Sequence, residues 1–224
     1  MQRLLLIPIF LCLIACQSQE QRAKALVAQF GSTDAVRRAE ASETLVAMGS
    51  EAIDALIQGV SDENPQIREM SAWVLSEIGT PAARVVPALI STLADPDENI
   101  RVMGSVALQN LGEPAVPYLI DALRTESAEI RLNAAYALGE IGTPLDTILP
   151  ALIRTLTDPE WNVRRLVVRA LVTIGTPALD SLVQALNSED PDLRRMAERA
   201  LSDIGTPEAR RAIADAKRQF SSDR

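Results

Sequence analysis

Arginine recurs at regular intervals along this chain and is the residue type best suited to bind an anion. Six arginines each follow directly after Val, Ile or Leu: Arg37, Arg68, Arg101, Arg131, Arg164 and Arg194. A guanidinium group can bind a carboxylate or a phosphate through two parallel hydrogen bonds. Six of them on one surface could therefore form an anion-binding row. The alternative is a structural role, in which each arginine joins neighbouring parts of the fold.

Catalytic chemistry has little support in the sequence. The chain contains no histidine, which excludes Ser-His-Asp triads, Cys-His dyads and histidine-based metal sites. It has no glycine-rich phosphate loop, and its carboxylates fall mostly in expected turns and on polar helix faces. We therefore expect no enzymatic activity, no metal site and no cofactor.

The charge distribution disfavours nucleic acid as a partner. The formal net charge is −8 and no basic block is present, whereas nucleic acid is bound through clustered Lys and Arg. Residues 32–157 contain 18 acidic and 8 basic residues, and residues 158–224 contain 11 of each. We interpret the acidic excess as a solvated surface, with a site for a basic partner as the alternative.

Glycine forms a second regular series that interlocks with the arginines. It recurs at positions 49, 79, 112, 142, 175 and 205, with spacings of 30, 33, 30, 33 and 30. The distance from arginine to glycine is 12 residues in the first case, counted from Arg37, and 11 in the other five. Two interlocked series of this kind indicate a chain of six repeats.

Each repeat has the pattern of two helices. Apolar residues at positions −1, +3, +7 and +10 from the arginine form one stripe of a helix, and alanines at +6 would let a neighbouring helix approach closely. The glycine can adopt the left-handed conformation that ends a helix. A Thr-Pro pair then predicts the N-cap and first turn of a second helix at Thr80-Pro81, Thr143-Pro144, Thr176-Pro177 and Thr206-Pro207. Three extra residues in the 33-residue repeats lengthen either this second helix or the segment that enters it.

The repeat resembles the HEAT-repeat family, in particular the short type first associated with phycobilisome lyases. The matching segments are Val163-Arg164, Ala135 to Gly142 and Pro150-Ala151-Leu152-Ile153, and the resemblance covers about residues 32–217. It implies an all-α, right-handed α-α superhelix of the HEAT/armadillo type. Six helix pairs would form the solenoid, and a helix containing Ala25-Leu26-Val27 and Phe30 would cap its N-terminal end.

The same resemblance implies a structural role for the arginines. An aspartate stands six residues before three of them, in the pairs Asp62/Arg68, Asp95/Arg101 and Asp158/Arg164. In HEAT proteins such pairs form a ladder of hydrogen bonds along the stack. Thr125 and Ser188 occupy the aspartate position in two repeats, so we expect a weaker ladder there. We favour this ladder over the anion-binding row.

The N-terminus has the features of an export signal. Arg3 precedes an apolar run from Leu4 to Ala15, which is too short to span a bilayer. The tetrad Leu13-Ile14-Ala15-Cys16 resembles the lipobox of bacterial lipoproteins. This resemblance implies cleavage before Cys16 and its lipidation, which would anchor an exported chain in the bacterial cell envelope. If the source is Gram-negative, the anchor would be in the outer membrane, on its periplasmic side. A plain secretory signal and an uncut apolar anchor are the alternatives.

These features predict four segments in the chain. Residues 1–15 are the signal peptide, residues 16–31 are the lipidated cysteine and capping helix, residues 32–220 are the solenoid, and residues 221–224 are a polar tail. The approximate repeats are 32–62, 63–95, 96–125, 126–158, 159–188 and 189–220.

Two aromatic residues depart from the pattern of their repeat positions. Trp161 stands three residues before its arginine, and Tyr118 stands where other repeats carry mainly small residues. Each could pack locally or contact a partner, because Trp and Tyr are enriched at binding hot spots. The favoured hypothesis is a lipid-anchored scaffold that binds a protein partner of unknown identity. The alternatives are a bilin lyase or lyase subunit, suggested by the repeat type alone, and a purely structural envelope protein.

Overall fold

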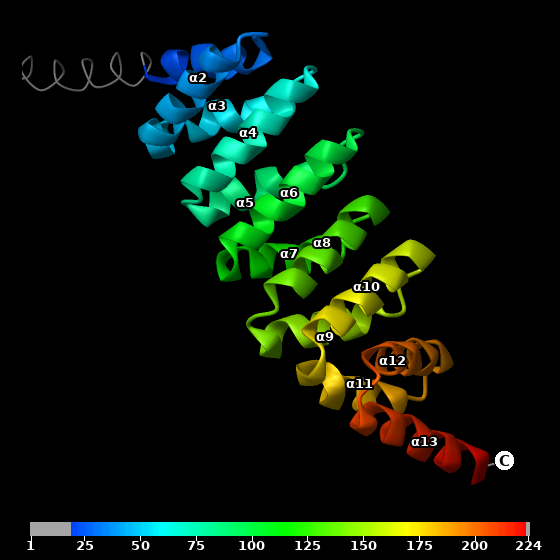
Figure 1. Ribbon diagram of the computed structural model, residues 1–224. Helices are drawn as coiled ribbons and strands as arrows, with labels where there is room; N and C mark the ends of the chain where they lie inside the picture. Colours follow the sequence, from blue (N-terminus) through cyan, green and yellow to red (C-terminus); the bar gives the residue numbers. More distant parts are fainter. Residues whose placement is uncertain (1–18, 223–224) are drawn as a thin grey trace, which may run out of the picture. The chain divides into compact units, whose positions relative to one another are not determined.

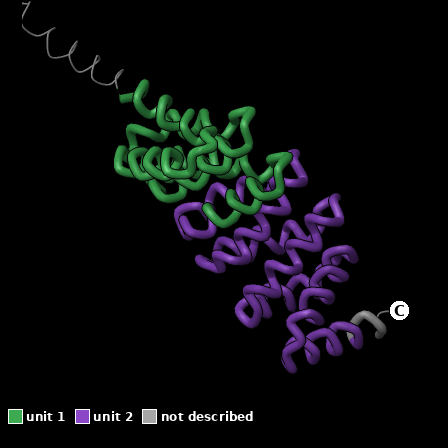
Figure 2. The backbone as a smooth tube through the Cα atoms, turned by 45° about the horizontal axis from the view of Figure 1, so that its top comes forward, with its two compact units in different colours: residues 1–107 green, residues 108–224 purple. Residues whose placement is uncertain are grey.

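The computed structural model describes residues 19–222, which form helices and turns with no strand among them (Figure 1). The expected signal peptide and Cys16 lie outside the described residues. Figure 2 shows the two compact units into which the chain divides, residues 1–107 and residues 108–224.

The first unit contains a short N-terminal helix, two complete helix pairs and most of the next first helix. Residues 19–28 are helical, followed by η1 (Gln29–Gly31), α2 (Ala35–Met48), η2 (Gly49–Glu51), α3 (Ile53–Gly59), α4 (Pro65–Ile78), α5 (Ala82–Thr92) and the greater part of α6 (Glu98–Leu111). In this unit α2 packs on α4, α3 packs on α5, and α3 and α5 each contact α4. First helices and second helices therefore form two layers.

The second unit repeats this two-layer arrangement. After the end of α6 it contains η3 (Glu113–Ala115), α7 (Val116–Ala122), α8 (Ala128–Ile141), α9 (Leu145–Thr155), α10 (Trp161–Ile174), η4 (Thr176–Ala178), α11 (Leu179–Leu186), α12 (Pro191–Ile204) and α13 (Pro207–Ser222). The first helices α8, α10 and α12 pack in series, and so do the second helices α7, α9, α11 and α13. The predicted all-α solenoid of helix pairs is confirmed.

The first helices are uniform because their start and their buried stripe recur. All six, α2, α4, α6, α8, α10 and α12, have 14 residues. Five of them are capped by a side chain that accepts a backbone N–H group of the first turn, namely that of Asp34, Asn64, Asp97, Ser127 or Asp190. In α10 the predicted stripe residues Val163, Val167 and Leu171 are buried.

The repeat register needs one correction at its first position. In five repeats the Nη1 of the marking arginine donates to the backbone carbonyl six residues before it. In the first repeat Arg38 makes this bond, to the carbonyl of Ser32 at 2.7 Å, while Arg37 is exposed and lies beside Asp34. The expectation that Arg37 marks the register is therefore wrong. With Arg38, the distance to Gly49 becomes 11 residues, as in the other repeats.

The six register glycines all have positive φ, between 59° and 73°, as their position after a helix predicted. Their ψ values divide them into two groups. Gly79, Gly142 and Gly205 are left-handed helical, whereas Gly49, Gly112 and Gly175 have ψ between −127° and −136°. The chain therefore leaves alternate first helices in different directions.

This alternation determines how each second helix begins. After Gly49, Gly112 and Gly175 a 3-10 turn precedes a second helix of 7 or 8 residues. After Gly79 and Gly142 no such turn follows, and α5 and α9 have 11 residues. The three additional residues thus lengthen the second helix by about one turn.

The predicted Thr-Pro helix starts hold at one site and differ at the others. Thr206 caps α13, since its Oγ1 accepts the N–H of Ala209. Thr80 and Thr143 do not cap, because Pro81 and Pro144 are extended and α5 and α9 begin one residue later. Their Thr-Pro peptide bonds are cis. Thr176 opens the 3-10 turn η4 rather than α11.

Small residues let the first helices of the second unit approach closely. A Cβ added to Gly139 in α8 would lie 2.6 Å from both Cα and Cβ of Ala170 in α10. Ala170 is one of the alanines at position +6 and is buried. In the first unit, Ala23, Val27 and Phe30 of the N-terminal segment are buried, and Val27 lies close to Gly59 of α3.

The register arginines hold the turns that precede their own helices. Besides the carbonyl six residues back, Nη1 of Arg68, Arg101, Arg131, Arg164 and Arg194 also contacts the carbonyl five residues back, at 2.8 to 3.1 Å. The two carbonyls lie in the turn after the preceding second helix, so the guanidinium satisfies acceptors that a helix end leaves free. In this way Arg68, Arg101 and Arg164 bind the backbone, not the carboxylate, of Asp62, Asp95 and Asp158.

Two of these arginines also reach the next repeat. Arg68 donates from Nε and Nη2 to the carboxylate of Asp95, at 2.7 and 3.0 Å, and Arg131 binds Asp158 at the same two distances. All four side chains are nearly buried, with exposed fractions of 6 to 13%. The same aspartates also accept a backbone N–H two residues ahead, from Asp97 and Glu160. Each buried carboxylate therefore joins one repeat to the next.

The ion pairs shift the pKa values of Arg68, Arg131 and Asp95. Hydrogen bonding to Asp95 and to Asp158 raises the pKa of Arg68 and of Arg131. For Asp95, burial acts to raise the pKa, but the hydrogen bonds from Arg68 and from the Asp97 backbone, with the nearby arginine charges, outweigh it. The pKa of Asp95 is therefore lowered.

We expect Asp95→Ala to destabilise the chain by about 3 kcal/mol, because it leaves the nearly buried Arg68 without its partner. Urea unfolding followed by circular dichroism measures this change. The control is Asp54→Ala, which removes an exposed carboxylate paired with Arg84 and should cost less than about 1 kcal/mol. Equal losses in both variants would contradict a special role for the buried pair.

The lowered pKa of Asp95 also predicts a dependence on pH. Its contribution to stability is complete above the unfolded-state pKa of about 3.9 and is lost as pH falls through the lower folded value. The difference in unfolding free energy between the wild type and Asp95→Asn should therefore be larger at pH 7 than at pH 3. A difference that does not shrink on acidification would show that the Asp95 charge does not matter.

Candidate binding surface

The described residues offer no metal centre. Between residues 19 and 222 no group of three or more His, Cys, Asp or Glu side chains is arranged to hold a metal ion. Within the same range no single helix is long and apolar enough to cross a membrane. One pair of segments, α10 with Thr176–Leu186, is together long and apolar enough for a membrane span, but the two segments are bent by 115° relative to each other.

Trp161 is the first residue of α10 and lies half exposed on the layer of first helices. Its exposed fraction is 49%, and the guanidinium carbon of Arg199 in α12 lies 5.5 Å from its ring centroid. Tyr136 and Arg169 make a similar contact at 5.4 Å between α8 and α10. Cation–π contacts of this kind link neighbouring first helices. Trp161 thus has a local partner while about half of its surface stays accessible.

Tyr118 lies on the other layer, in the second helix α7, and is half-buried. Its repeat equivalents Ala55, Ala88 and Ala151 are buried. The larger side chain therefore extends beyond the level that the alanines occupy. Because Tyr118 and Trp161 belong to different helix layers, they do not form one site, and each stays a separate candidate for partner contact.

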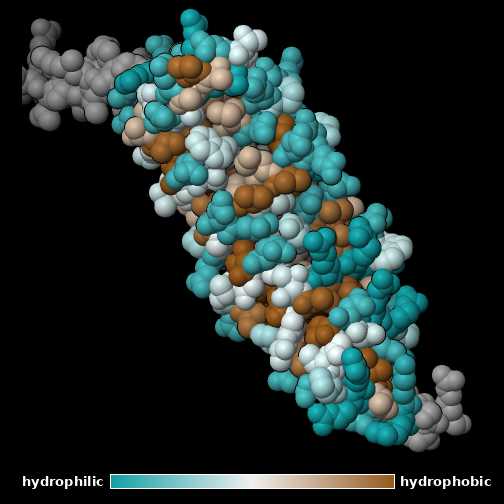
Figure 3. Space-filling model, viewed as in Figure 1, coloured by the Kyte–Doolittle hydropathy of each residue, from teal (hydrophilic) through white to brown (hydrophobic). Residues whose placement is uncertain are grey.

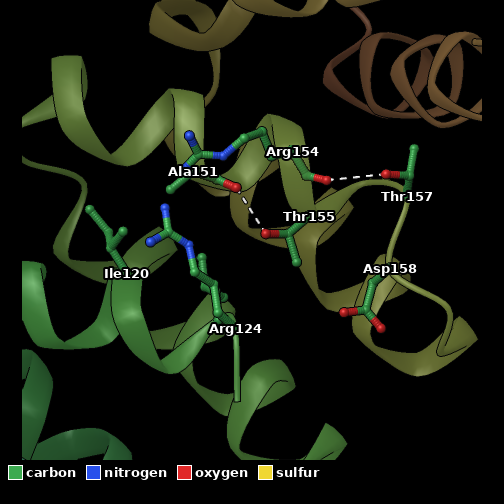
Figure 4. Close-up of a pocket in the computed structure, with 8 residues that line it drawn as sticks. Ile120, Arg124, Ala151, Arg154, Thr155, Thr157 and Asp158 are labelled. Atoms are coloured by element: carbon green, nitrogen blue, oxygen red, sulfur yellow. Dashed lines mark hydrogen bonds between the residues drawn. The ribbon is translucent and has the colours of Figure 1, made fainter. Parts of the chain in front are cut away.

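The second helices of the second unit border a series of cavities. The first, of about 210 Å³, lies between α7 and α9 and is lined by Ile120, Leu123, Arg124, Ala151, Arg154, Thr155, Thr157 and Asp158. Figure 4 shows the side chains of Arg124 and Arg154 extending toward the same end of this cavity, with Asp158 on the turn at its other side. This end of the cavity is therefore cationic.

A second cavity, of about 470 Å³, occupies the equivalent place one repeat further on, between α9 and α11. Its lining residues are Pro150, Ile153, Arg154, Ser181, Gln184, Ala185, Ser188 and Leu193. Here Ile153 takes the place of Ile120, Ser181 that of Ala151, and Ser188 that of Asp158. Arg154 lines both cavities.

A third cavity, of about 480 Å³, continues the series between α11 and α13, where Val183, Asn187, Glu208, Arg211, Ala212, Asp215 and Ala216 line it. Arg211 at this cavity is paired with Glu208, and Arg124 at the first lies 3.8 Å from Asp121. Arg154 differs from both, since its side chain has no polar partner among the residues that the structure describes. It is the least compensated cation of the three.

Apolar groups accompany these charges. In Figure 3, hydrophobic patches separated by hydrophilic side chains occupy the face in view over the second unit. Ile120, Ile153 and Leu193 contribute apolar lining to the first two cavities. The cavities therefore combine small apolar contacts with cationic groups.

The sequence missed these cavity residues for an identifiable reason. Arg154 belongs to a repeat position that holds Gln58, Ser91, Asp121, Gln184 and Ala214 in the other repeats, a row without a readable charge pattern. Only the packing of α9 between α7 and α11 places Arg154 at two cavities. The sequence shows that Ser188 stands at the aspartate position, but it does not show that Ser188 lines a cavity.

The chain is similar to solved structures of several kinds of protein. The MAST/Orbit N-terminal domain is 22% identical and has a TM-score of 0.54, covering 88% of this chain and 95% of its own. The complex of CpcE and CpcF of phycocyanin lyase from Nostoc sp. PCC7120 is 28% identical with a TM-score of 0.41, covering 87% and 81%. An engineered protein is 22% identical with a TM-score of 0.40, covering 82% and 96%. No curated protein matches the chain.

The sequence pattern of HEAT repeats matches nearly the whole described part of the chain, at residues 23–101, 86–152 and 149–219. These matches cover both compact units and the helix pairs of each. The expected resemblance is thereby confirmed, and the chain belongs to the HEAT-repeat family.

Proposed function

We propose that this chain is a lipid-anchored scaffold of the bacterial cell envelope, which binds a protein partner through its HEAT-repeat surface. The observation that carries the binding role is the series of cavities along the second helices of residues 108–224. HEAT and armadillo-like repeats typically serve as protein-binding scaffolds, and stacked repeats create extended surfaces for such contacts. Catalysis is not part of this proposal.

The proposed anchor rests on the sequence alone. The tetrad that ends at Cys16 supports lipidation, and the helical chain begins by residue 19, so an anchored solenoid would lie close to the membrane. Stable anchoring needs more than one acyl chain, which lipoprotein processing would supply.

We expect Trp161→Ala or Tyr118→Ala to weaken partner binding by about tenfold or more, because aromatic anchors contribute most at hot spots. The partner is first captured from detergent-solubilised envelope and identified, and its affinity for each purified variant is then measured by calorimetry. Trp73→Ala is the matched control, since Trp73 is half-buried within α4 and should alter stability rather than affinity. Unchanged affinity in both test variants would exclude these two anchors. Saturable bilin-dependent absorbance of the purified chain would favour the lyase alternative instead.

We expect the native N-terminal peptide to begin at Cys16 and to carry lipid. Mass spectrometry of the membrane-extracted protein measures this directly, and Cys16→Ser should release the chain from the membrane fraction. A peptide that extends before residue 16, or an unmodified Cys16, would contradict lipid anchoring while leaving the binding role intact.

A further inference from the structure

We propose that Arg164 of α10 binds the carboxylate of an acidic side chain that the protein partner places beside the turn containing Ser188. The partner's carboxylate takes the place that Asp158 occupies for Arg131 one repeat earlier. This inference rests on the proposed scaffold function and names the group of the partner that is recognised.

The contact between Arg131 and Asp158 provides the reference geometry. Arg131 uses Nη1 to hold the carbonyls of Thr125 and Glu126, and presents Nε and Nη2 to the carboxylate of the next repeat. Asp158 accepts these two hydrogen bonds through its two carboxylate oxygens, and its Oδ1 also accepts the N–H of Glu160. One carboxylate thus serves both the guanidinium and its own turn.

Arg164 is held by its turn in the same way. Its Nη1 donates to the carbonyls of Asp158 and Pro159 at 2.6 and 2.8 Å, the counterparts of Thr125 and Glu126. Repeat equivalence therefore directs the Nε and Nη2 edge toward the turn that contains Ser188. Those two nitrogens have no partner among the described residues, although the side chain is half-buried.

Ser188 replaces only half of what an aspartate supplies. Its Oγ accepts the N–H of Asp190 at 3.2 Å, as Asp158 Oδ1 does for Glu160, so the turn keeps its own hydrogen bond. A hydroxyl has no second oxygen for the guanidinium. The turn is complete, but the acceptor for Arg164 is missing.

The space next to this turn is open. The cavity lined by Ser188 is about 470 Å³, against about 210 Å³ for the equivalent cavity beside Asp158. Arg154, whose charge has no partner among the described residues, lines the same cavity, and Ile153 and Leu193 add apolar walls. A carboxylate flanked by apolar groups matches this lining in charge and in polarity.

The inference is tested by nuclear magnetic resonance on the ¹⁵N-labelled full chain in detergent micelles. The probe is the capped pentapeptide acetyl-Ala-Leu-Glu-Leu-Ala-amide, which carries a single side-chain carboxylate, and its twin with Gln in place of Glu is the neutral control. The Nε–H resonance of Arg164, identified by its loss in Arg164→Lys, should shift saturably with the Glu peptide only. The Nε–H resonances of Arg68 and Arg131 should not move, because their acceptors are already present.

Ser188→Asp provides the matched variant, since it supplies the missing carboxylate from within the chain. In this variant the Glu peptide should no longer shift the Arg164 resonance. Its melting temperature should rise by about 2–4 °C, as expected for a gain of about one strong hydrogen-bonded contact in a chain of this size. The rise also shows that the variant folds.

Three results would overturn the inference. They are no saturable shift of Arg164 up to the solubility limit of the peptide, an undiminished shift in Ser188→Asp, and an equal shift with the Gln twin or with inorganic phosphate. The outcome is separable from that of the scaffold proposal. A captured partner that binds Ser188→Asp and Arg164→Lys as tightly as the wild type supports the scaffold and contradicts the role of Arg164.

Discussion

One guanidinium per repeat, bonded to the turn between successive helix pairs, is the interaction on which the rest of this structure depends. The turn between two successive helix pairs follows a helix end and therefore leaves carbonyl groups without helical partners. Those carbonyls accept hydrogen bonds from one arginine in the first helix of the same repeat, namely Arg38, Arg68, Arg101, Arg131, Arg164 or Arg194. Where the next repeat supplies Asp95 or Asp158, the same side chain also joins two repeats through a nearly buried ion pair.

Backbone conformation divides the repeats into two alternating kinds. Glycine tolerates positive φ with either a helical or an extended ψ, and this chain uses the two states in turn. The left-handed glycines are followed by the longer second helices α5 and α9, and the others by short ones behind a 3-10 turn. In the second unit, α9 therefore stands between the shorter helices α7 and α11, with a cavity on each side.

A repeat whose arginine lacks an aspartate partner differs from a repeat in which the ion pair is complete. The absence of this ion pair lowers the stability of the fold. It also leaves the Nε and Nη2 donors of the guanidinium oriented by the turn and already partly desolvated. Such preorganised donors lose little freedom when they bind an anion. From the sequence alone, a structural ladder and an anion-binding row are alternatives for all six arginines. The two roles can thus apply to different arginines of the same series.

The sequence by itself determined the helix pairs, the repeat lengths and the glycine positions, because local periodicity and backbone preference act within a few residues. It also identified Asp95 and Asp158 as ladder positions, together with Asp62, whose carboxylate pairs with no arginine among residues 19–222. It did not determine the register at Arg37 and Arg38, since Arg37 follows an apolar residue whereas Arg38 has the 11-residue distance to Gly49. It could not show that Arg68 and Arg131 pair with the aspartate of the following repeat, or that Arg154 and Ser188 border one cavity. Those relations join residues about 30 positions apart, and only the packing of one repeat on the next brings them together.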